Sequence, residues 1–115
     1  MTMAKKDPTI LLDQILESID LIFEYTASVT PEEFKADGKT KDAILMHLIV
    51  IGEAANKLPE DFRKKHHTIE WMRIIRTRHI IAHEYGRVDF DIIWRIITLY
   101  LPEARESLRK LYREL

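Results

Sequence analysis

The sequence predicts an all-α fold, an up-and-down bundle of four main helices joined by short connecting helices. Apolar residues recur at helical spacing through long segments of the chain. Only 3 Gly and 4 Pro are present, which leaves little material for the tight turns of an all-β fold. With 115 residues the chain can build one core but not two. We therefore expect residues 1–115 to form a single helical domain.

Capping signals mark the first two helices. Asp7 precedes a proline and a stripe of apolar residues at helical spacing, so a helix is expected over residues 8–25. Thr30 and Glu33 have the spacing of a capping box, which predicts a short second helix. This helix is expected to end at a turn formed by Asp37-Gly38.

The third helix, expected from Thr40 to Leu58, contains the run AILMHLIVIG, which is apolar around nearly its whole circumference. One side can face the core, and the other side needs a partner. A second copy of the chain is the simplest candidate, because most soluble oligomers are two-fold homodimers. The alternative is a central helix that is wrapped by its own neighbours. His47, inside this run, is interpreted as a packing residue.

Two further long helices complete the predicted bundle. Pro59 ends the third helix, and after a polar connector Thr68 can cap a helix that begins near Ile69. The last helix restarts after Asp89. Because proline lacks an N–H group and clashes with the preceding turn, Pro102 is expected to kink this helix or to split it.

Composition and charge exclude several classes of protein. The chain has no cysteine, so disulfides and thiolate metal sites are absent. No apolar run approaches the ~20 residues that span a bilayer, and the N-terminus lacks an apolar signal core. We therefore expect a soluble cytoplasmic protein with no membrane partner. The net charge is only -1, so any contact with nucleic acid must come from local clustering.

One such cluster lies between Arg63 and His79. Six basic residues face the single acid Glu70 in this segment, namely Arg63, Lys64, Lys65, Arg73, Arg76 and Arg78. A charge run of this kind is usually a solvated surface. Beside a phosphate site it would instead form an electrostatic track for RNA or DNA.

Arg78 lies in the middle of an apolar helix face. The other members of this face, at ~100° per residue, are Trp71, Ile74, Ile75, Ile81, Ala82 and Tyr85. A guanidinium keeps its charge in proteins, so its burial requires acceptors. It could form an internal ion pair with Glu53 or Asp42, or bend its head group out to water. Alternatively, the face opens into a cleft where Arg78 binds an anion such as phosphate.

His79 and His83 are four residues apart, so they lie on the same flank of this helix. Zinc normally needs three or four protein ligands, and the chain has neither Cys nor an HExxH motif, so we expect no metal. Histidine can instead transfer a proton near neutral pH, while Arg78 stabilises charge on a phosphate. Residues five apart are rotated by ~140°, so Arg78 and His83 converge poorly within one helix. At a two-fold axis, Arg78 of one chain could approach His83 of the other.

The stretch from Arg78 to Tyr85, RHIIAHEY, resembles the R-x4-H-x-Y motif of HepT-like toxins in the HEPN superfamily. The segments IGEAANKLPEDF and VDFDIIW, together with Trp71, extend the resemblance over about residues 41–97. Gly86-Arg87 departs from the Phe-Gly that is more usual after the tyrosine. Gly86 is well placed to end the helix in a left-handed cap, which would put the hydroxyl of Tyr85 at the rim of a cleft.

The resemblance implies an all-α homodimer that cleaves RNA without a metal or other cofactor. Arg78 and His83 would be catalytic at the dimer interface, with His79 in support. Attack of the ribose 2′-hydroxyl on the adjacent phosphate would leave a 2′,3′-cyclic phosphate, a route open only to RNA. The protein would be the toxin of a type VII-like toxin–antitoxin system, inactivated when a minimal nucleotidyltransferase antitoxin transfers AMP to Tyr85.

Two alternatives to the ribonuclease stay open. One is a catalytically silent helical dimer that binds a nucleotidyltransferase and a nucleotide or nucleic acid. The other is a structural dimer in which Arg78 forms an internal salt bridge.

Overall fold

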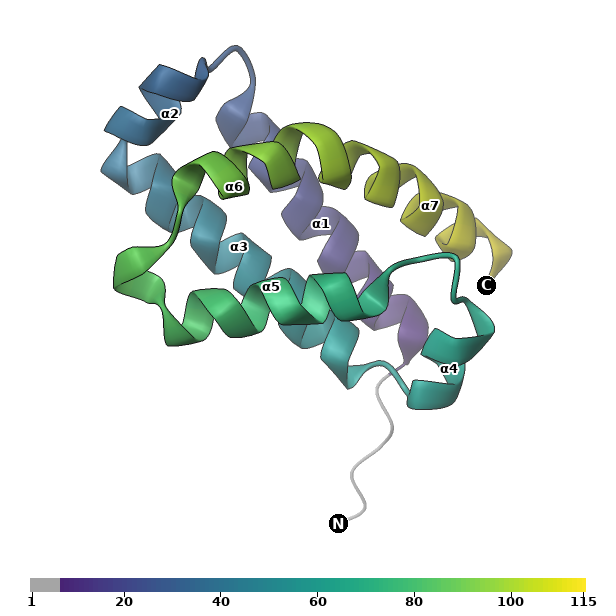
Figure 1. The fold of residues 1–115 in the computed structure, drawn as a ribbon. Helices are drawn as coiled ribbons and strands as arrows, with labels where there is room; N and C mark the ends of the chain where they lie inside the picture. The colour runs from purple at the N-terminus through teal and green to yellow at the C-terminus, as the bar shows by residue number, and fades with distance from the viewer. Residues whose placement is uncertain (1–6) are drawn as a thin grey trace.

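The protein, in a computed structural model that describes residues 7–115, is all-α, with no strand in that range (Figure 1). The elements are α1 (Pro8–Thr26), α2 (Pro31–Ala36), α3 (Gly38–Lys57), α4 (Glu60–Lys65), α5 (Trp71–His83), the 3₁₀ turn η1 (Tyr85–Arg87), α6 (Phe90–Arg95), the π-helical turn η2 (Ile96–Tyr100) and α7 (Leu101–Glu114). α6, η2 and α7 follow one another without a break. The bundle therefore has four long segments, α1, α3, α5 and α6–α7, which confirms the predicted fold class.

α3 is the central helix of this bundle. It packs along α1 on one side and along α5 on the other, while α7 packs against α1 (Figure 1). Most of its apolar residues are buried, and Met46 is the one large apolar side chain of α3 that is more than half exposed. The helix is thus wrapped by its own neighbours, and its apolar circumference does not require a second copy of the chain. The alternative of a central helix is the one observed, so a dimer has to be argued from other surfaces of the chain.

The caps predicted for the first two helices are present. The Asp7 carboxylate accepts a hydrogen bond from the Thr9 amide at 2.8 Å. Thr30 and Glu33 bond to each other's backbone amides at 3.0 and 3.1 Å, which completes a capping box. Gly38, expected in a turn, is instead the first residue of α3, because the Asp37 side chain caps that helix directly.

The start of α5 differs from the sequence prediction. α5 begins at Trp71 rather than near Ile69, and Thr68 does not cap it. The indole of Trp71 donates a hydrogen bond to the His66 carbonyl at 3.0 Å, which fixes the start of the helix by a tertiary contact. Pro102 lies at the start of α7, and the π-helical turn η2 separates α7 from α6, so the last α-helix is split next to the proline as predicted. The wide turn η2 just before it accommodates the proline within a continuous helical segment.

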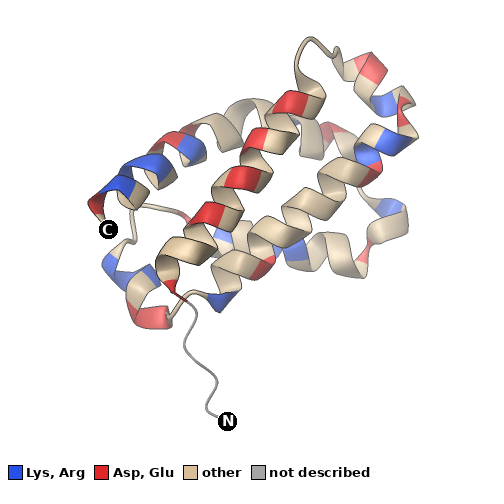
Figure 2. Cartoon of the chain, turned by 180° about the vertical axis from the view of Figure 1, so that it is seen from behind, with Lys and Arg blue, Asp and Glu red and all other residues tan. Residues whose placement is uncertain are grey.

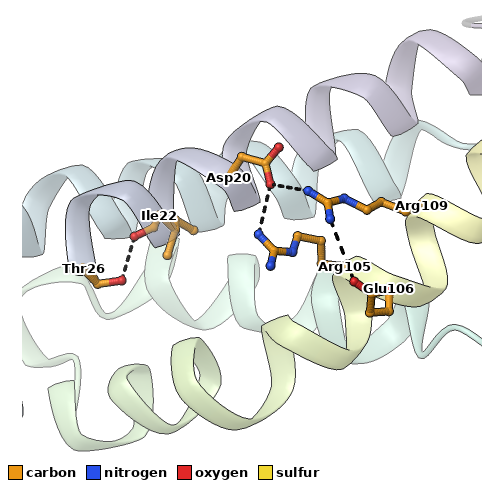
Figure 3. Close-up of polar contacts among 6 residues, drawn as sticks. All are labelled: Asp20, Ile22, Thr26, Arg105, Glu106 and Arg109. Carbon is orange, nitrogen blue, oxygen red and sulfur yellow. Dashed lines mark hydrogen bonds and ion pairs between the residues drawn. The ribbon is translucent and has the colours of Figure 1, made fainter. Parts of the chain in front are cut away.

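Polar contacts join α1 to α7 at the surface. Asp20 of α1 accepts hydrogen bonds from Arg105 and Arg109 of α7, both at 3.4 Å (Figure 3). The Arg105 guanidinium also lies over the Phe23 ring, 4.4 Å from its centroid. Surface ion pairs contribute little individually, so these contacts orient α7 on α1 while the apolar core supplies most of the stability.

A second polar contact joins α1 to α3. The Nδ1 atom of His47 lies 3.2 Å from the hydroxyl of Ser18, which is 5% exposed. This contact agrees with the interpretation of His47 as a packing residue. No helix within residues 7–115 combines the length and apolarity that a bilayer crossing requires.

Candidate active site

Arg78 reaches from α5 to α3, where its Nη2 atom forms an ion pair with Oε1 of Glu53 at 2.5 Å. Of the two carboxylates considered from the sequence, Glu53 is therefore its partner. The pair is not sealed from solvent, because the two side chains are 35% and 38% exposed. The buried Nε of Arg78 has no hydrogen-bond partner in the described part of the chain. A guanidinium has five N–H donors, so this one keeps donors for a further ligand.

Gly52 of α3 makes the approach of Arg78 possible. A Cβ atom added at Gly52 would lie 2.1 Å from the Cβ of Arg78 and 3.2 Å from the carbonyl oxygen of Ile74. No side chain fits in that space. The Ile74 oxygen is part of the α5 backbone and the Arg78 Cβ is bonded to it, so neither atom can move aside without a shift of the helix. Gly52 and Glu53 are adjacent in sequence, so one turn of α3 supplies both the room for Arg78 and its carboxylate. Sequence reasoning missed Gly52, although a glycine within an apolar helix was a visible signal of close packing.

His79 and His83 lie side by side on the exposed flank of α5, as their spacing predicts. Their ring centroids are 4.3 Å apart, with the ring planes inclined at 56°. Both side chains are exposed. Within residues 7–115, no group of three or more His, Cys, Asp or Glu side chains is arranged to hold a metal ion.

Tyr85 lies just beyond the end of α5, in the turn η1, and is 52% exposed. Its hydroxyl donates a hydrogen bond to Oδ1 of Asp42 at 3.0 Å. This hydrogen bond, with smaller effects from desolvation and the carboxylate charge, raises the pKa of Tyr85 above its usual value. Asp42, considered from the sequence as a partner for Arg78, therefore holds the tyrosine instead.

Gly86 does not form the predicted left-handed cap, since its φ angle is not positive. α5 ends at His83, and the chain continues directly into η1, where the Arg87 amide donates to the Glu84 carbonyl at 2.8 Å. Tyr85 therefore lies outside α5, and both Tyr85 and Ala82, placed on the apolar face by the helical wheel, are exposed. Trp71, Ile74 and Ile81 of that face are buried as predicted.

A single subunit keeps Arg78 and His83 on different sides of α5. Arg78 points to α3, while His79 and His83 lie on the outer flank, about 100° and about 140° away around the helix. The chain thus presents a partly open guanidinium and an exposed pair of imidazoles as two separate groups. The cation is suited to binding a phosphate, and the imidazoles are suited to proton transfer.

Comparison with known proteins identifies the family. The sequence profile described as "Ribonuclease HepT-like" matches residues 15–111, which is most of the chain and includes every residue of the candidate site. The chain belongs to the HepT-like ribonuclease family. No solved structure matches this HepT-like chain.

Three archaeal relatives of this HepT-like chain carry ribonuclease names. It is 36% identical over 111 residues to a Methanocaldococcus jannaschii protein named "Gamma-glutamylcyclotransferase and putative RNase"; the match covers 96% of this chain but only 50% of that relative. A second protein of that organism, named "Putative RNase", is 34% identical over 98% of this chain and 93% of its own length. "Probable ribonuclease HepT" of Thermococcus cleftensis is 35% identical over 87% of this chain and 91% of its own.

Replacement of Gly52 tests the contact that positions Arg78. We expect Gly52→Ala to lower the free energy of unfolding by about 1–3 kcal/mol, because the added Cβ forces α3 and α5 apart. Gly38→Ala is the matched control, since nothing lies within 4 Å of a Cβ at that position. It should be neutral or stabilising by up to ~1 kcal/mol. Urea unfolding of the two variants measures both values, and equal stabilities would contradict the close contact.

Proposed function

We propose that this HepT-like protein is a metal-independent endoribonuclease toxin whose active site forms between two subunits. Each site would combine Arg78 of one subunit with His83 and His79 of the other. The observation that best supports the proposal is the placement of these groups on α5. Arg78 is held by Glu53 yet keeps about a third of its side chain exposed, and the histidine pair is exposed on another flank.

An apolar surface beside the histidines suits a second copy of the chain. Ile80 of α5 and Ile92 of α6 are 54% and 51% exposed, and Leu99 of η2 is 67% exposed. Ile80, Ile92 and Ile96 line a groove of about 220 Å³ between α5 and α6. Burial of such residues across a two-fold axis would remove apolar area from water and bring two copies of α5 together.

The proposed reaction is an internal transfer at the RNA phosphate. The ribose 2′-oxygen attacks phosphorus and loses its proton to the imidazole of His83, which acts as general base. The bond from phosphorus to the 5′-oxygen breaks, and that oxygen takes a proton from the second imidazole, His79. Arg78 of the other subunit donates hydrogen bonds to the non-bridging oxygens, where negative charge develops. The products are a 2′,3′-cyclic phosphate and a free 5′-hydroxyl.

Tyr85 is suited to be a point of inactivation. Its hydroxyl lies two residues beyond His83 and is accessible, so a nucleotidyltransferase antitoxin could transfer AMP to it with release of pyrophosphate from ATP. Each AMP adds bulk and negative charge at the position where an RNA backbone would approach the histidines. The hydrogen bond to Asp42 holds the tyrosine at the edge of α3 before modification.

Removal of either proposed catalytic side chain should abolish cleavage. We expect Arg78→Ala and His83→Ala each to lower kcat/KM on single-stranded RNA by about 10²–10⁴-fold, because each removes transition-state stabilisation or proton transfer. Activity of the wild type should persist in EDTA, and mass spectrometry should find cyclic phosphate ends. Arg113→Ala, an exposed arginine of α7, is the control. Cleavage that survives both substitutions, or a wild type without activity, would favour the catalytically silent alternative.

Modification of Tyr85 can be followed by intact mass. After co-expression with a cognate nucleotidyltransferase, the wild-type chain should gain mass in units of AMP and lose ribonuclease activity. Tyr85→Phe should gain no mass, because it lacks the acceptor hydroxyl. Tyr112→Phe is the control, since Tyr112 is also exposed but lies on α7. Equal modification of Tyr85→Phe would show that the acceptor is another residue.

A further inference from the structure

A hollow of about 900 Å³ lies between α4 and the first turns of α5, outside the candidate active site. Its charged lining consists of four cations and two acids, namely Arg63, Lys64, Arg73, Arg76, Glu60 and Glu70. Figure 1 shows α4 beside the end of α5 that is remote from η1. The hollow therefore begins at the N-terminal end of the helix that carries Arg78 and the histidines.

The acids of the hollow neutralise only half of its cations. Glu60 pairs with Lys64 and Glu70 pairs with Arg73, both at 3.3 Å. Within residues 7–115, neither Arg63 nor Arg76 takes part in a salt bridge, and the buried Nε of Arg63 has no hydrogen-bond partner. Two guanidinium groups thus remain as excess positive charge. Guanidinium forks match the geometry of phosphate oxygens.

The hollow also has an apolar side. Met72 is 54% exposed at its edge, and Trp71 and Ile69 form part of its buried lining. A purely electrostatic anion site would not need this apolar surface. Apolar surface beside cations suits a nucleotide, whose base packs against side chains while its phosphate binds arginine.

One strip of α5 connects the hollow to the histidine pair. Four residues lie in a line along the exposed flank of α5, because they are spaced by four, three and four positions. They are Met72, Arg76, His79 and His83. At 1.5 Å per residue, Arg76 lies roughly 10.5 Å along the axis from His83. A single strand that follows α5 can therefore occupy the hollow and the candidate active site together.

The acidic strip of α1 lies away from this path. α1 carries Asp13, Glu17, Asp20 and Glu24 along one exposed strip, visible as red bands on that helix in Figure 2. α1 packs against α3 and α7 rather than beside the hollow. A polyanion is repelled from the α1 face and attracted to the surface of α4 and α5.

We propose that the hollow between α4 and α5 binds the segment of single-stranded RNA next to the scissile phosphate, with Arg63 and Arg76 on its phosphates. The inference rests on the proposed function in that RNA is the substrate. Binding in the hollow is nevertheless separable from cleavage, because Arg76 takes no part in the proposed proton transfers. The ligand class is a nucleic acid strand, and an acidic protein partner is the competing occupant.

The test uses an RNA that binds but cannot be cleaved. A fluorescein-labelled 2′-O-methyl RNA of roughly 12 nucleotides lacks the attacking hydroxyl, and fluorescence anisotropy gives its Kd for the full-length chain over a series of salt concentrations. For Arg76→Gln we expect a Kd about fourfold higher near 0.15 M salt, and a slope of log Kd against log salt that is shallower by about 0.7, as for one lost phosphate contact. Arg76→Lys should recover most of the affinity.

Arg113→Gln, which removes the same charge from α7, is the matched control and should leave the Kd nearly unchanged. On cleavable RNA, Arg76→Gln should raise KM for the oligonucleotide. Equal weakening by Arg113→Gln, no weakening by Arg76→Gln, or no binding by the wild type would overturn the proposal. So would normal RNA binding by Arg76→Gln combined with loss of a nucleotidyltransferase complex. A further outcome is a wild type that binds RNA without cleaving it and an Arg76→Gln variant that binds more weakly. That result would support RNA binding in the hollow and would refute only the ribonuclease activity.

Discussion

The close contact between Gly52 of α3 and Arg78 of α5 is the constraint on which the candidate site depends. A charged guanidinium on the apolar face of a helix needs both space and an acceptor. α3 supplies the space and the acceptor at consecutive positions, because Gly52 has no side chain and Glu53 contributes a carboxylate. The ion pair stays at the edge of the interface between the helices, so Arg78 is fixed in place without being enclosed.

This constraint divides the chemistry of α5 between two sides of one helix. Arg78 faces α3, and His79 and His83 face outward, so one subunit holds the cation and the proton-transfer groups apart. A second subunit across the apolar surface of Ile80 and Ile92 offers the most economical way to join them. The same outer flank continues to Arg76 and the basic hollow, which would give the proposed RNA substrate a continuous path along α5.

Much of the fold follows from local signals that the sequence displays. The Asp7 cap, the capping box of Thr30 and the helical periodicity each specify a structure through neighbouring residues, and each is present. The sequence predicts less well where contacts between residues distant in the sequence determine the local structure. The indole of Trp71 fixes the start of α5 through its hydrogen bond to the His66 carbonyl. The apolar residues of α3 are mostly buried against α1 and α5. The motif located Arg78, but the choice of Glu53 over Asp42 required the packing of α3 against α5.

The central claim is that each active site takes Arg78 from one subunit and its histidines from the other, and a mixed dimer tests it most directly. Differently tagged Arg78→Ala and His83→Ala chains are co-expressed, and the dimer that carries both tags is purified. One of its two sites then contains an intact Arg78 and an intact His83, so we predict about half of the wild-type activity, although each variant alone is inactive. A mixed dimer as inactive as the two parents would contradict the account.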